Sequence, residues 1–435
     1  MNSKTKTPTT KEDATPALVP KLRFPEFREA EGWELVTLQE ASVPVTERVG
    51  QRKLTPVSIS AGIGFVPQSE KFGRDISGNQ YHLYTLVRDG DFVFNKGNSL
   101  KFPQGCIYLL QGWGQVAAPN VFICFRLKDG YSNGFFQNCF EQNQHGRQLK
   151  RHITSGARSN GLLNISKETF FGVEIPTPSP AEQQKIADCL SSMDELLSAQ
   201  ARKLDALKTH KKGLMQQLFP REGETQPHLR FPEFEDAGEW EEYKLIDIAT
   251  FRRGSFPQPY GLPEWYDEDG GMPFVQVFDV GDNFRLKDRT KSKISKLGAE
   301  KSVFIPKGTL IVTLQGSIGR VAISHYDAYI DRTLLIFESF LMPIEKVFFA
   351  RLIQNLFDIE KEIAPGGIIK TITKEALSEF KVKLPTIPEQ QRIADCLTSL
   401  DDLIAAQTQK LALLKTHKQG LMQQLFPASE DQNTL

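Results

Sequence analysis

The feature that most constrains this chain is a 39-residue segment that occurs twice. Residues 182–220 read EQQKIADCLSSMDELLSAQARKLDALKTHKKGLMQQLFP, and residues 389–427 read EQQRIADCLTSLDDLIAAQTQKLALLKTHKQGLMQQLFP. The two copies differ at 11 of their 39 positions and begin 207 residues apart (389 − 182). Self-similarity at a fixed offset predicts a chain built from two related halves.

Both copies have the periodicity of a long amphipathic helix. Seam residues recur at alternating spacings of four and three from Ile186 to Leu218, and again from Ile393 to Leu425. This heptad pattern predicts a helix about 55 Å long, at about 1.5 Å per residue. Such a helix has one apolar face that needs a partner, and the nearest partner is its own copy.

A glutamine lies at the middle of each seam. In an antiparallel pair related by a pseudo-two-fold axis, the midpoints face each other, so Gln200 would hydrogen-bond Gln407 and fix the register. A parallel pair would also bring equivalent residues together. A third interpretation is that each glutamine is solvated at the helix edge.

The composition excludes several classes of protein. The 435-residue chain has 53 Lys+Arg and 53 Asp+Glu, so its net charge does not indicate nucleic-acid binding, although a balanced chain can carry local basic patches. No apolar run approaches the roughly 18 residues that a membrane helix needs. The polar N-terminus lacks the apolar core of a signal peptide. The five cysteines form no CxxC pair, which predicts a cytoplasmic protein with reduced thiols, no metal site and no membrane contact.

The repeat extends beyond the helices. The segment LRFPEF occurs at 22–27 and 229–234, and ISKE at 165–168 matches ITKE at 372–375. Each half therefore has a leading segment, a body and a long helix. The predicted domains are a disordered tail (1–20), a first body (21–180), a first long helix (181–220), a second body (221–387), a second long helix (388–427) and a tail (428–435).

The two bodies do not align by eye but share an order of elements. Strands are predicted at 91–94, 106–110 and 121–127, followed by a helix at 135–153; in the second body strands are predicted at 310–314, 320–324 and 333–338, followed by a helix at 344–363. This order predicts one α+β fold used twice, with similar mounting and different working surfaces. It suits a protein that performs one task on two different targets.

These features together resemble the specificity subunit of type I restriction-modification systems. The match is carried by the two helices, each entered through a Pro-containing lead and EQQ (PSPAEQQ and PTIPEQQ), by the ISKE and ITKE turns, and by duplicated halves of this size. It covers essentially residues 21–427. Its scaffold motifs are specific, whereas the residues that read a target differ from member to member.

The resemblance implies two target recognition domains of mixed α/β fold, separated by two long antiparallel helices that form a coiled coil. Each domain would read one half of a bipartite site in double-stranded DNA, and the helices would fix the unread spacer. The subunit would have no catalysis of its own. Two modification subunits would bind S-adenosylmethionine and methylate adenine, and restriction subunits with motor and nuclease activity would use ATP and Mg²⁺.

Candidate DNA contacts are basic and amide side chains in loops. Arg and Lys can bind guanine O6 and N7, Asn and Gln can read adenine, and Lys can bind phosphate. The alternatives are an ordinary solvated surface, a strand edge protected by charge, and, for the Gln315–Arg320 segment, a tight turn. The candidates are Lys96, Asn98, Lys101, Arg147, Lys150, Arg151, Arg158 and Asn160 in the first body, and Arg285, Lys287, Arg289, Lys291, Lys293, Gln315, Ser317, Arg320 and Lys370 in the second.

The helices carry a second set of candidates. The same polar letters recur near the end of both copies, which suggests docking of a modification subunit; a solvated face is the alternative. These residues are Lys208, His210, Lys212, Lys415 and His417.

The chain lacks the motifs of an enzyme that would act on DNA. It has no Asn/Asp-Pro-Pro-Tyr/Phe methyltransferase motif, no Gly-rich S-adenosylmethionine loop, no Walker A sequence and no convincing nuclease constellation. Catalysis is therefore expected from partners. Two alternatives remain: a coiled-coil adaptor whose bodies bind protein or carbohydrate, and a self-sufficient nuclease with built-in recognition.

Overall fold

The computed structural model divides the chain into two compact units. One unit comprises residues 1–199 and 411–435, and the other comprises residues 200–410. Each long helix therefore contributes to both units. The described residues are 18–97, 102–153, 163–221, 223–281, 283–363 and 377–427.

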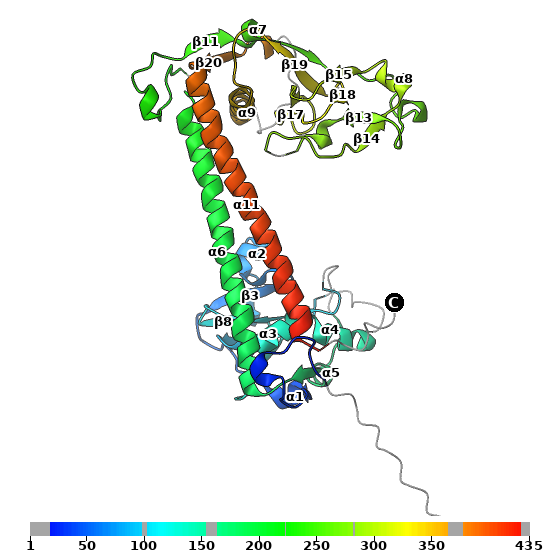
Figure 1. The fold of residues 1–435 in the computed structure, drawn as a ribbon. Helices are drawn as coiled ribbons and strands as arrows, with labels where there is room; N and C mark the ends of the chain where they lie inside the picture. The colour runs from blue at the N-terminus through cyan, green and yellow to red at the C-terminus, as the bar shows by residue number, and fades with distance from the viewer. Residues whose placement is uncertain are drawn as a thin grey trace, which may run out of the picture. The chain divides into compact units, whose positions relative to one another are not determined.

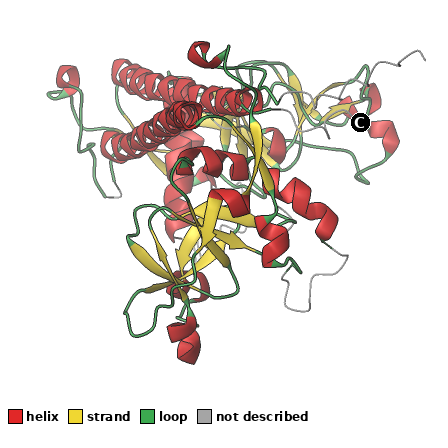
Figure 2. Ribbon diagram, turned by 90° about the horizontal axis from the view of Figure 1, so that it is seen from below, coloured by secondary structure: helices red, strands yellow, loops and turns green. Residues whose placement is uncertain are grey.

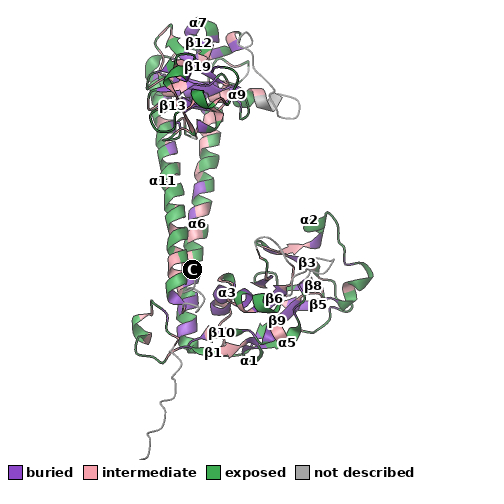
Figure 3. Cartoon of the chain, turned by 90° about the vertical axis from the view of Figure 1, so that its right-hand side faces the viewer, coloured by how far each residue is buried: buried purple, intermediate pink, exposed green. Residues whose placement is uncertain are grey.

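The duplicated segment forms the two long helices α6 (Pro180–Leu218) and α11 (Ile387–Leu425), each of 39 residues (Figure 1). The first unit contains the start of α6 and the end of α11, and the second contains the end of α6 and the start of α11. Leu190 and Leu397 are fully buried at equivalent seam positions, while most of the remaining helix surface is exposed (Figure 3). The predicted pair of packed helices is confirmed, and within each unit the pairing is antiparallel.

The first unit carries a body of short strands and helices. Its strands form a two-stranded sheet β1-β10 and two four-stranded sheets, β2-β9-β6-β7 and β4-β3-β8-β5. The strands are β1 (Glu34–Thr37), β2 (Ser42–Pro44), β3 (Thr55–Ser60), β4 (Gly64–Pro67), β5 (Thr85–Arg88), β6 (Asp91–Asn95), β7 (Cys106–Leu109), β8 (Gln115–Ala118), β9 (Ile123–Leu127) and β10 (Glu174–Thr177). The helices are η1 (Pro25–Phe27), α1 (Leu38–Ala41), α2 (Gln68–Phe72), η2 (Gly78–Leu83), α3 (Asn133–Glu141), α4 (Gln144–Leu149), η3 (Lys150–His152) and α5 (Lys167–Phe171).

The second unit repeats this arrangement. Its sheets are β11-β20, β12-β19-β16-β17 and β14-β13-β18-β15. The strands are β11 (Glu241–Lys244), β12 (Ala249–Arg253), β13 (Met272–Val275), β14 (Ser292–Ile294), β15 (Val303–Ile305), β16 (Leu310–Thr313), β17 (Val321–Ile323), β18 (Ala328–Ile330), β19 (Leu334–Phe340) and β20 (Lys381–Leu384). The helices are η4 (Pro232–Phe234), α7 (Leu245–Ile248), η5 (Pro263–Trp265), η6 (Val277–Asp279), α8 (Lys296–Ala299) and α9 (Lys346–Ile363).

The two bodies have the same strand orders in the part of the chain that the structure describes. Their strands are the yellow arrows of Figure 2. Each strand of the first body corresponds to the strand of the second body whose number is ten higher. The parallel pairing between named strands of the described residues also corresponds, since β3 pairs with β8 and β13 pairs with β18. The prediction of one α+β fold used twice is confirmed, even though the two sequences do not align by eye.

Most of the predicted elements are present, with one correction. The predicted strands correspond to β6, β7 and β9 and to β16, β17 and β19, and the predicted helix of the second body is α9. The helix predicted over 135–153 is wrong as a single element, because Asn143 has a left-handed backbone (φ 59°) between α3 and α4. A left-handed residue interrupts the helical hydrogen-bond ladder.

In each unit the core of the body continues onto the helix pair. The first core contains Phe125 and Phe170 together with Ile186 of α6 and Phe426 at the end of α11. The second core is built in the same way, with Phe219 at the end of α6 and Ile393 of α11. The body and the helix ends of one unit are therefore a single packed structure.

Candidate nucleic-acid interface

A buried ion pair fixes the leading segment of each half to the start of a long helix. In the first unit Arg23 donates from Nε and Nη2 to the two carboxylate oxygens of Glu182, at 2.8 and 2.7 Å. In the second unit Arg230 makes the same fork with Glu389, at 2.8 and 2.7 Å. These hydrogen bonds raise the pKa of both guanidinium groups. The pairing explains why the letters LRFPEF and EQQ recur together.

The first glutamine of each EQQ motif also has a structural role. The Gln183 side chain donates to the carbonyl of Pro178 and accepts from the backbone N–H of Ser132, both at 2.9 Å. Gln390 makes the equivalent bonds to Pro385 and Glu345, at 2.9 and 3.0 Å. The motif thus joins the Pro-rich lead, the helix start and the body helix region.

The LFP sequence that ends each copy of the repeat places a phenylalanine in a cluster of three aromatic rings. Phe426 stacks on Phe135 with ring centroids 5.4 Å apart, and Trp33 packs edge-on against both rings. The second unit has the same three-ring cluster, formed by Phe219, Phe348 and Trp240. We call the ion pair and the three rings of each unit the mount.

Loops at one edge of the second body bring polar side chains together. Because β13 and β18 are parallel, their carboxyl ends lie side by side, which places residues 276–278 next to residues 331–333. The loop between β16 and β17 approaches the same place, since a Cβ at Gly316 would lie 3.5 Å from Val277. A cavity of about 320 Å³ opens here, lined by Tyr260, Gln276, Val277, Phe278, Asp331, Arg332 and Thr333.

This edge, which we call the second strand-end edge, has the chemistry to read bases. Among the described residues, the Asp331 Oδ2 atom is buried without a hydrogen-bond partner, and Asp331 is one of the residues that line the cavity. The Arg332 guanidinium lies over the Tyr260 ring at 5.2 Å. Carboxylates can accept from base amino groups, guanidinium groups can bind guanine, and aromatic rings can stack on bases.

Gln315 and Ser317 are exposed on the β16–β17 loop, as expected for a surface loop, and Arg320 is half-buried. Sequence reasoning missed Gln276, Asp331 and Arg332. The available signal was their place directly after buried strands, but those strands were not predicted.

Five basic residues, which we call the basic run, lie beside the second strand-end edge. Arg285, Lys287, Arg289 and Lys291 are exposed on the connection from β13 to β14, and Lys293 is half-buried within β14. The buried Asp279 organises this connection, because its two oxygens accept from the backbone N–H groups of Lys291 and Gln276, both at 2.9 Å. Burial raises the pKa of Asp279. Lys291 also lies 4.9 Å from the ring of Phe278, a residue of the cavity.

The equivalent edge of the first body differs. There the β3–β4 connection is only the short turn 61–63, so this body has no counterpart of the basic run at that position. Lys96 lies in the β6–β7 loop, which corresponds to the β16–β17 loop, and its carbonyl accepts from the N–H of Leu163 at 2.9 Å. Lys96 is half-buried. Asn98 and Lys101 of the same loop lie outside the described residues.

The described ones among the remaining candidates of the first body lie on two short helices beside β10. Arg147, Lys150 and Arg151 are exposed on α4 and η3. Gln148 anchors α4 to β10 through two bonds with the backbone of Glu174, at 2.6 and 3.0 Å. Arg151 lines a cavity of about 310 Å³ there. Arg158, Asn160 and Lys370 lie outside the described residues.

The helices place their polar residues on two different faces. The expected docking residues, Lys208, His210, Lys212, Lys415 and His417, are all exposed. The seam holds other contacts. Within the second unit Gln200 donates to Gln407 and Lys211 pairs with Asp401. Within the first unit Lys418 binds both oxygens of Asp194, at 2.7 and 2.8 Å.

The described residues contain no group of three or more His, Cys, Asp or Glu side chains placed to hold a metal ion. None of the helices in the described part is long and apolar enough to cross a membrane.

Comparison with known proteins gives a consistent result. A family model described as "Type I restriction modification DNA specificity domain" matches residues 79–209 and 237–416, which is more than half of the chain. Among curated relatives, a putative type I restriction enzyme MjaX specificity subunit of Methanocaldococcus jannaschii is 24% identical over 286 residues, 65% of each chain. The MjaVIII specificity subunit of the same organism is 24% identical over 289 residues, 63% of this chain and 66% of its own. The chain thus aligns to about two thirds of the length of these relatives.

Two solved structures share the fold. One, described as the structural basis of complex assembly and conformational transition of the type I R-M system, has a TM-score of 0.55 at 18% identity and covers 91% of this chain and 98% of its own. The other is a type I restriction-modification S subunit from M. genitalium, with a TM-score of 0.53 at 14% identity, covering 94% and 99%. At these identities the likeness concerns the fold alone.

Proposed function

Because this chain belongs to the type I restriction modification DNA specificity family, we propose that it is the non-catalytic DNA specificity subunit of a type I restriction-modification complex. Each unit reads one half of a bipartite site in double-stranded DNA. The helix pair sets the unread spacer between the two halves and docks the catalytic partners.

One observation carries this proposal: the mounts of the two units are the same, whereas the strand-end edges differ. The Arg–Glu fork and the three rings recur contact for contact. By contrast, a long basic connection in the second body stands where the first has a short turn. Two bodies held in the same way with different edges are what a single chain needs to read two different half-sites.

The second strand-end edge supplies both kinds of contact that DNA recognition requires. Exposed Arg285, Lys287 and Arg289 suit phosphate contacts, which position a protein without reading sequence. Gln276, Asp331 and Arg332, with Gln315 and Ser317 on the neighbouring loop, suit base edges. In the first body we assign the corresponding role to the β6–β7 loop with Lys96, Asn98 and Lys101, and supporting contacts to Arg147, Lys150, Arg151, Arg158 and Asn160.

The catalytic steps belong to partners in this proposal. Two modification subunits bring S-adenosylmethionine and methylate adenine, and restriction subunits bring ATP and Mg²⁺. Docking of equivalent subunits on both helices is supported by exposed residues that recur in part between the copies. They are Lys208, His210 and Lys212 on α6, and Lys415 and His417 on α11. A role in register for Gln200 and Gln407 belongs to the same proposal.

The test is a methylation map. The chain is expressed with the modification subunit of its own system in a host that lacks adenine methylation, and N6-methyladenine is mapped across the genome. A two-part motif with a fixed gap is expected. Exchange of residues 240–372 for those of another family member should change one half of the motif and leave the other half intact.

Point variants separate the two kinds of contact. Asp331→Asn should relax or change the motif at one position of one half-site. Lys287→Ala should instead weaken DNA binding on every sequence and reduce the slope of log K against log salt by about 1. Absence of methylation while the partner is bound would refute the proposal and favour an adaptor that binds protein or carbohydrate.

A further inference from the structure

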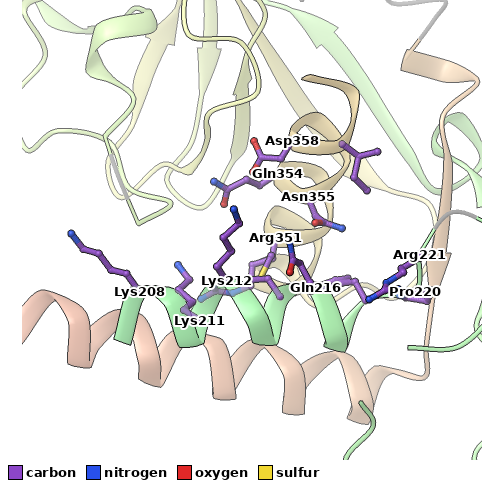
Figure 4. A pocket seen from close by; sticks show the side chains of 13 residues that line it. Lys208, Lys211, Lys212, Gln216, Pro220, Arg221, Arg351, Gln354, Asn355 and Asp358 are labelled. Atoms are coloured by element: carbon purple, nitrogen blue, oxygen red, sulfur yellow. The ribbon is translucent and has the colours of Figure 1, made fainter. Parts of the chain in front are cut away.

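The second unit contains a cavity that the proposed DNA contacts do not use. It measures about 590 Å³ and lies between the end of α6 and one face of α9. Figure 4 shows lysine side chains of α6 and polar side chains of α9 directed into the same space. Its charged lining residues are Lys208, Lys211, Lys212, Arg221, Arg351 and Asp358.

Arg351, which lines this cavity, has a buried guanidinium group with unpartnered donors. Its side chain is 2% exposed, and its Nη2 atom donates to Asp401 at 2.8 Å and to Thr398 at 3.2 Å. The guanidinium also lies over the Phe284 ring at 5.0 Å. Its Nε and Nη1 atoms are buried and have no hydrogen-bond partner among the described residues. A buried donor without an acceptor costs folding free energy. A ligand that brought an acceptor to these two N–H groups would remove that cost.

The charge balance around the cavity favours an anion. Asp401 is already shared, because one oxygen pairs with Lys211 and the other with Arg351. With Asp358 as the second carboxylate, two negative groups face five positive ones. Cations gathered in a concave site attract anions more strongly than the same charges on a flat surface.

The first unit provides an internal comparison. Phe135 and Phe348 occupy the same place in the two mounts, so the residue three positions later is Asn138 in the first unit and Arg351 in the second. Asn138 is satisfied locally, since its Nδ2 donates to the carbonyl of Gly134 at 2.7 Å. A buried guanidinium with two unpartnered donors is therefore a property of the second unit and is not required by the fold.

Two further differences point the same way. By the same alignments, Lys212 of α6 corresponds to Gln419 of α11, and Gln354 of α9 corresponds to Glu141 of α3. In the first unit Glu141 lies 3.8 Å from Lys418 and offsets its charge. Each of the three replacements makes the second unit more attractive to an anion than the first.

We propose that this cavity is a binding site for a phosphate-bearing ligand, with Arg351, Lys208 and Lys212 as its main contacts. Arginine matches phosphate because its planar fork can donate two parallel bonds, and lysine adds charge without fixed geometry. The volume exceeds that of a single phosphate and is of the size that holds a nucleotide. The phosphate could come from a nucleotide or from the backbone of bound DNA. The DNA source rests on the proposed function, whereas the nucleotide source does not.

The test measures binding of inorganic pyrophosphate, the first probe, to the full-length chain by isothermal titration calorimetry. The key variant is Lys212→Gln with Gln354→Glu, which gives the second unit the residues that the first unit carries. Lys212 is exposed and Gln354 is half-buried beside the cavity, so the fold should be retained and the melting temperature should stay close to that of the wild type. The matched control is Lys203→Glu, an exposed position of α6 outside the cavity with the same change in net charge.

The wild type and the control should bind pyrophosphate equally, and the double variant should bind at least tenfold more weakly. ATP and a short DNA duplex then identify the source of the phosphate. Tighter binding of ATP than of pyrophosphate indicates a nucleotide, whereas displacement of pyrophosphate by the duplex indicates the DNA backbone. No binding of pyrophosphate by the wild type, or equal binding by the double variant, would overturn the proposal. The methylation map is read separately, so failure here leaves the DNA-reading proposal standing.

Discussion

Replacement of Arg230 by methionine should strongly destabilise the second unit. The Arg230 and Glu389 side chains are only 8% and 1% exposed, so their fork is a buried ion pair. Without the guanidinium, Glu389 stays buried, and among the described residues its remaining side-chain donor is the Trp240 Nε1 atom at 3.3 Å. The carbonyl of Ala237 also loses its bond of 2.6 Å. Removal of one partner of a buried pair costs about 3–5 kcal/mol, which is a large share of the roughly 5–15 kcal/mol of a typical domain.

The loss can be measured by urea denaturation, and hydrogen exchange with mass spectrometry can assign it to the second unit. The matched control is Glu233→Gln, because Glu233 of the same leading segment pairs with Arg392 of the same helix at 2.9 Å, but both side chains are about half exposed. Surface pairs contribute little, so this control should stay close to the wild type. The double variant Arg230→Met with Glu389→Met should recover most of the stability. If Arg230→Met costs no more than the control, burial of the pair is not what holds the leading segment to the helix.

Three further predictions address the seam, pH and the β16–β17 loop. Gln200→Leu should cost about 1–3 kcal/mol in urea because it leaves the Gln407 amide unpaired, and the double Leu variant should be more stable than either single one; equal losses in all three would contradict this. Burial lowers the pKa of His145 to about 4 from 6.5, so the unfolded chain binds more protons between these values and stability should fall by up to about 3 kcal/mol as pH drops through this window. His145→Phe should flatten that dependence, and an unchanged pH profile would refute it. Gly319→Ala should lower the melting temperature, because Gly319 has a φ of 80° and a Cβ would lie 2.5 Å from the Cβ of Phe357; a melting temperature equal to the wild type would contradict the geometry.

The scaffold could be predicted from the sequence because its signals are local and repeated. Heptad spacing predicts a helix without knowledge of the rest of the chain, and the fixed offset shows that the helix occurs twice. The expected neighbours Gln200 and Gln407 do form a hydrogen bond. The sequence alone does not show why the EQQ and LRFPEF motifs recur together. The reason is the ion pair between Arg23 of LRFPEF and Glu182 of EQQ, which are 159 positions apart in sequence.

The strand-end edges could not be predicted in the same way. Short strands such as β13 and β18 have three or four residues each, which is too few for a clear alternation. Their pairing is parallel and long-range, so it depends on the whole body rather than on nearby residues. Asp331 and Arg332 become neighbours of Gln276 only through that pairing. The basic run from Arg285 to Lys293 was visible as charge, but its position beside the cavity depends on the buried Asp279.

The helix pair explains why two such different bodies can share one scaffold. Asp194 pairs with Lys418, and the equivalent residues Asp401 and Lys211 pair with each other, so one contact is made twice with its members taken from opposite copies. A change at one position in one copy therefore breaks a contact with the other copy and can be compensated only there. The described side chains at the second strand-end edge are different, because the contacts of Asp279, Lys291 and Arg332 given above all lie within the second body. The seam positions of the two helices are thus constrained to change together, whereas the second body can change its strand-end edge without a matching change in the helices.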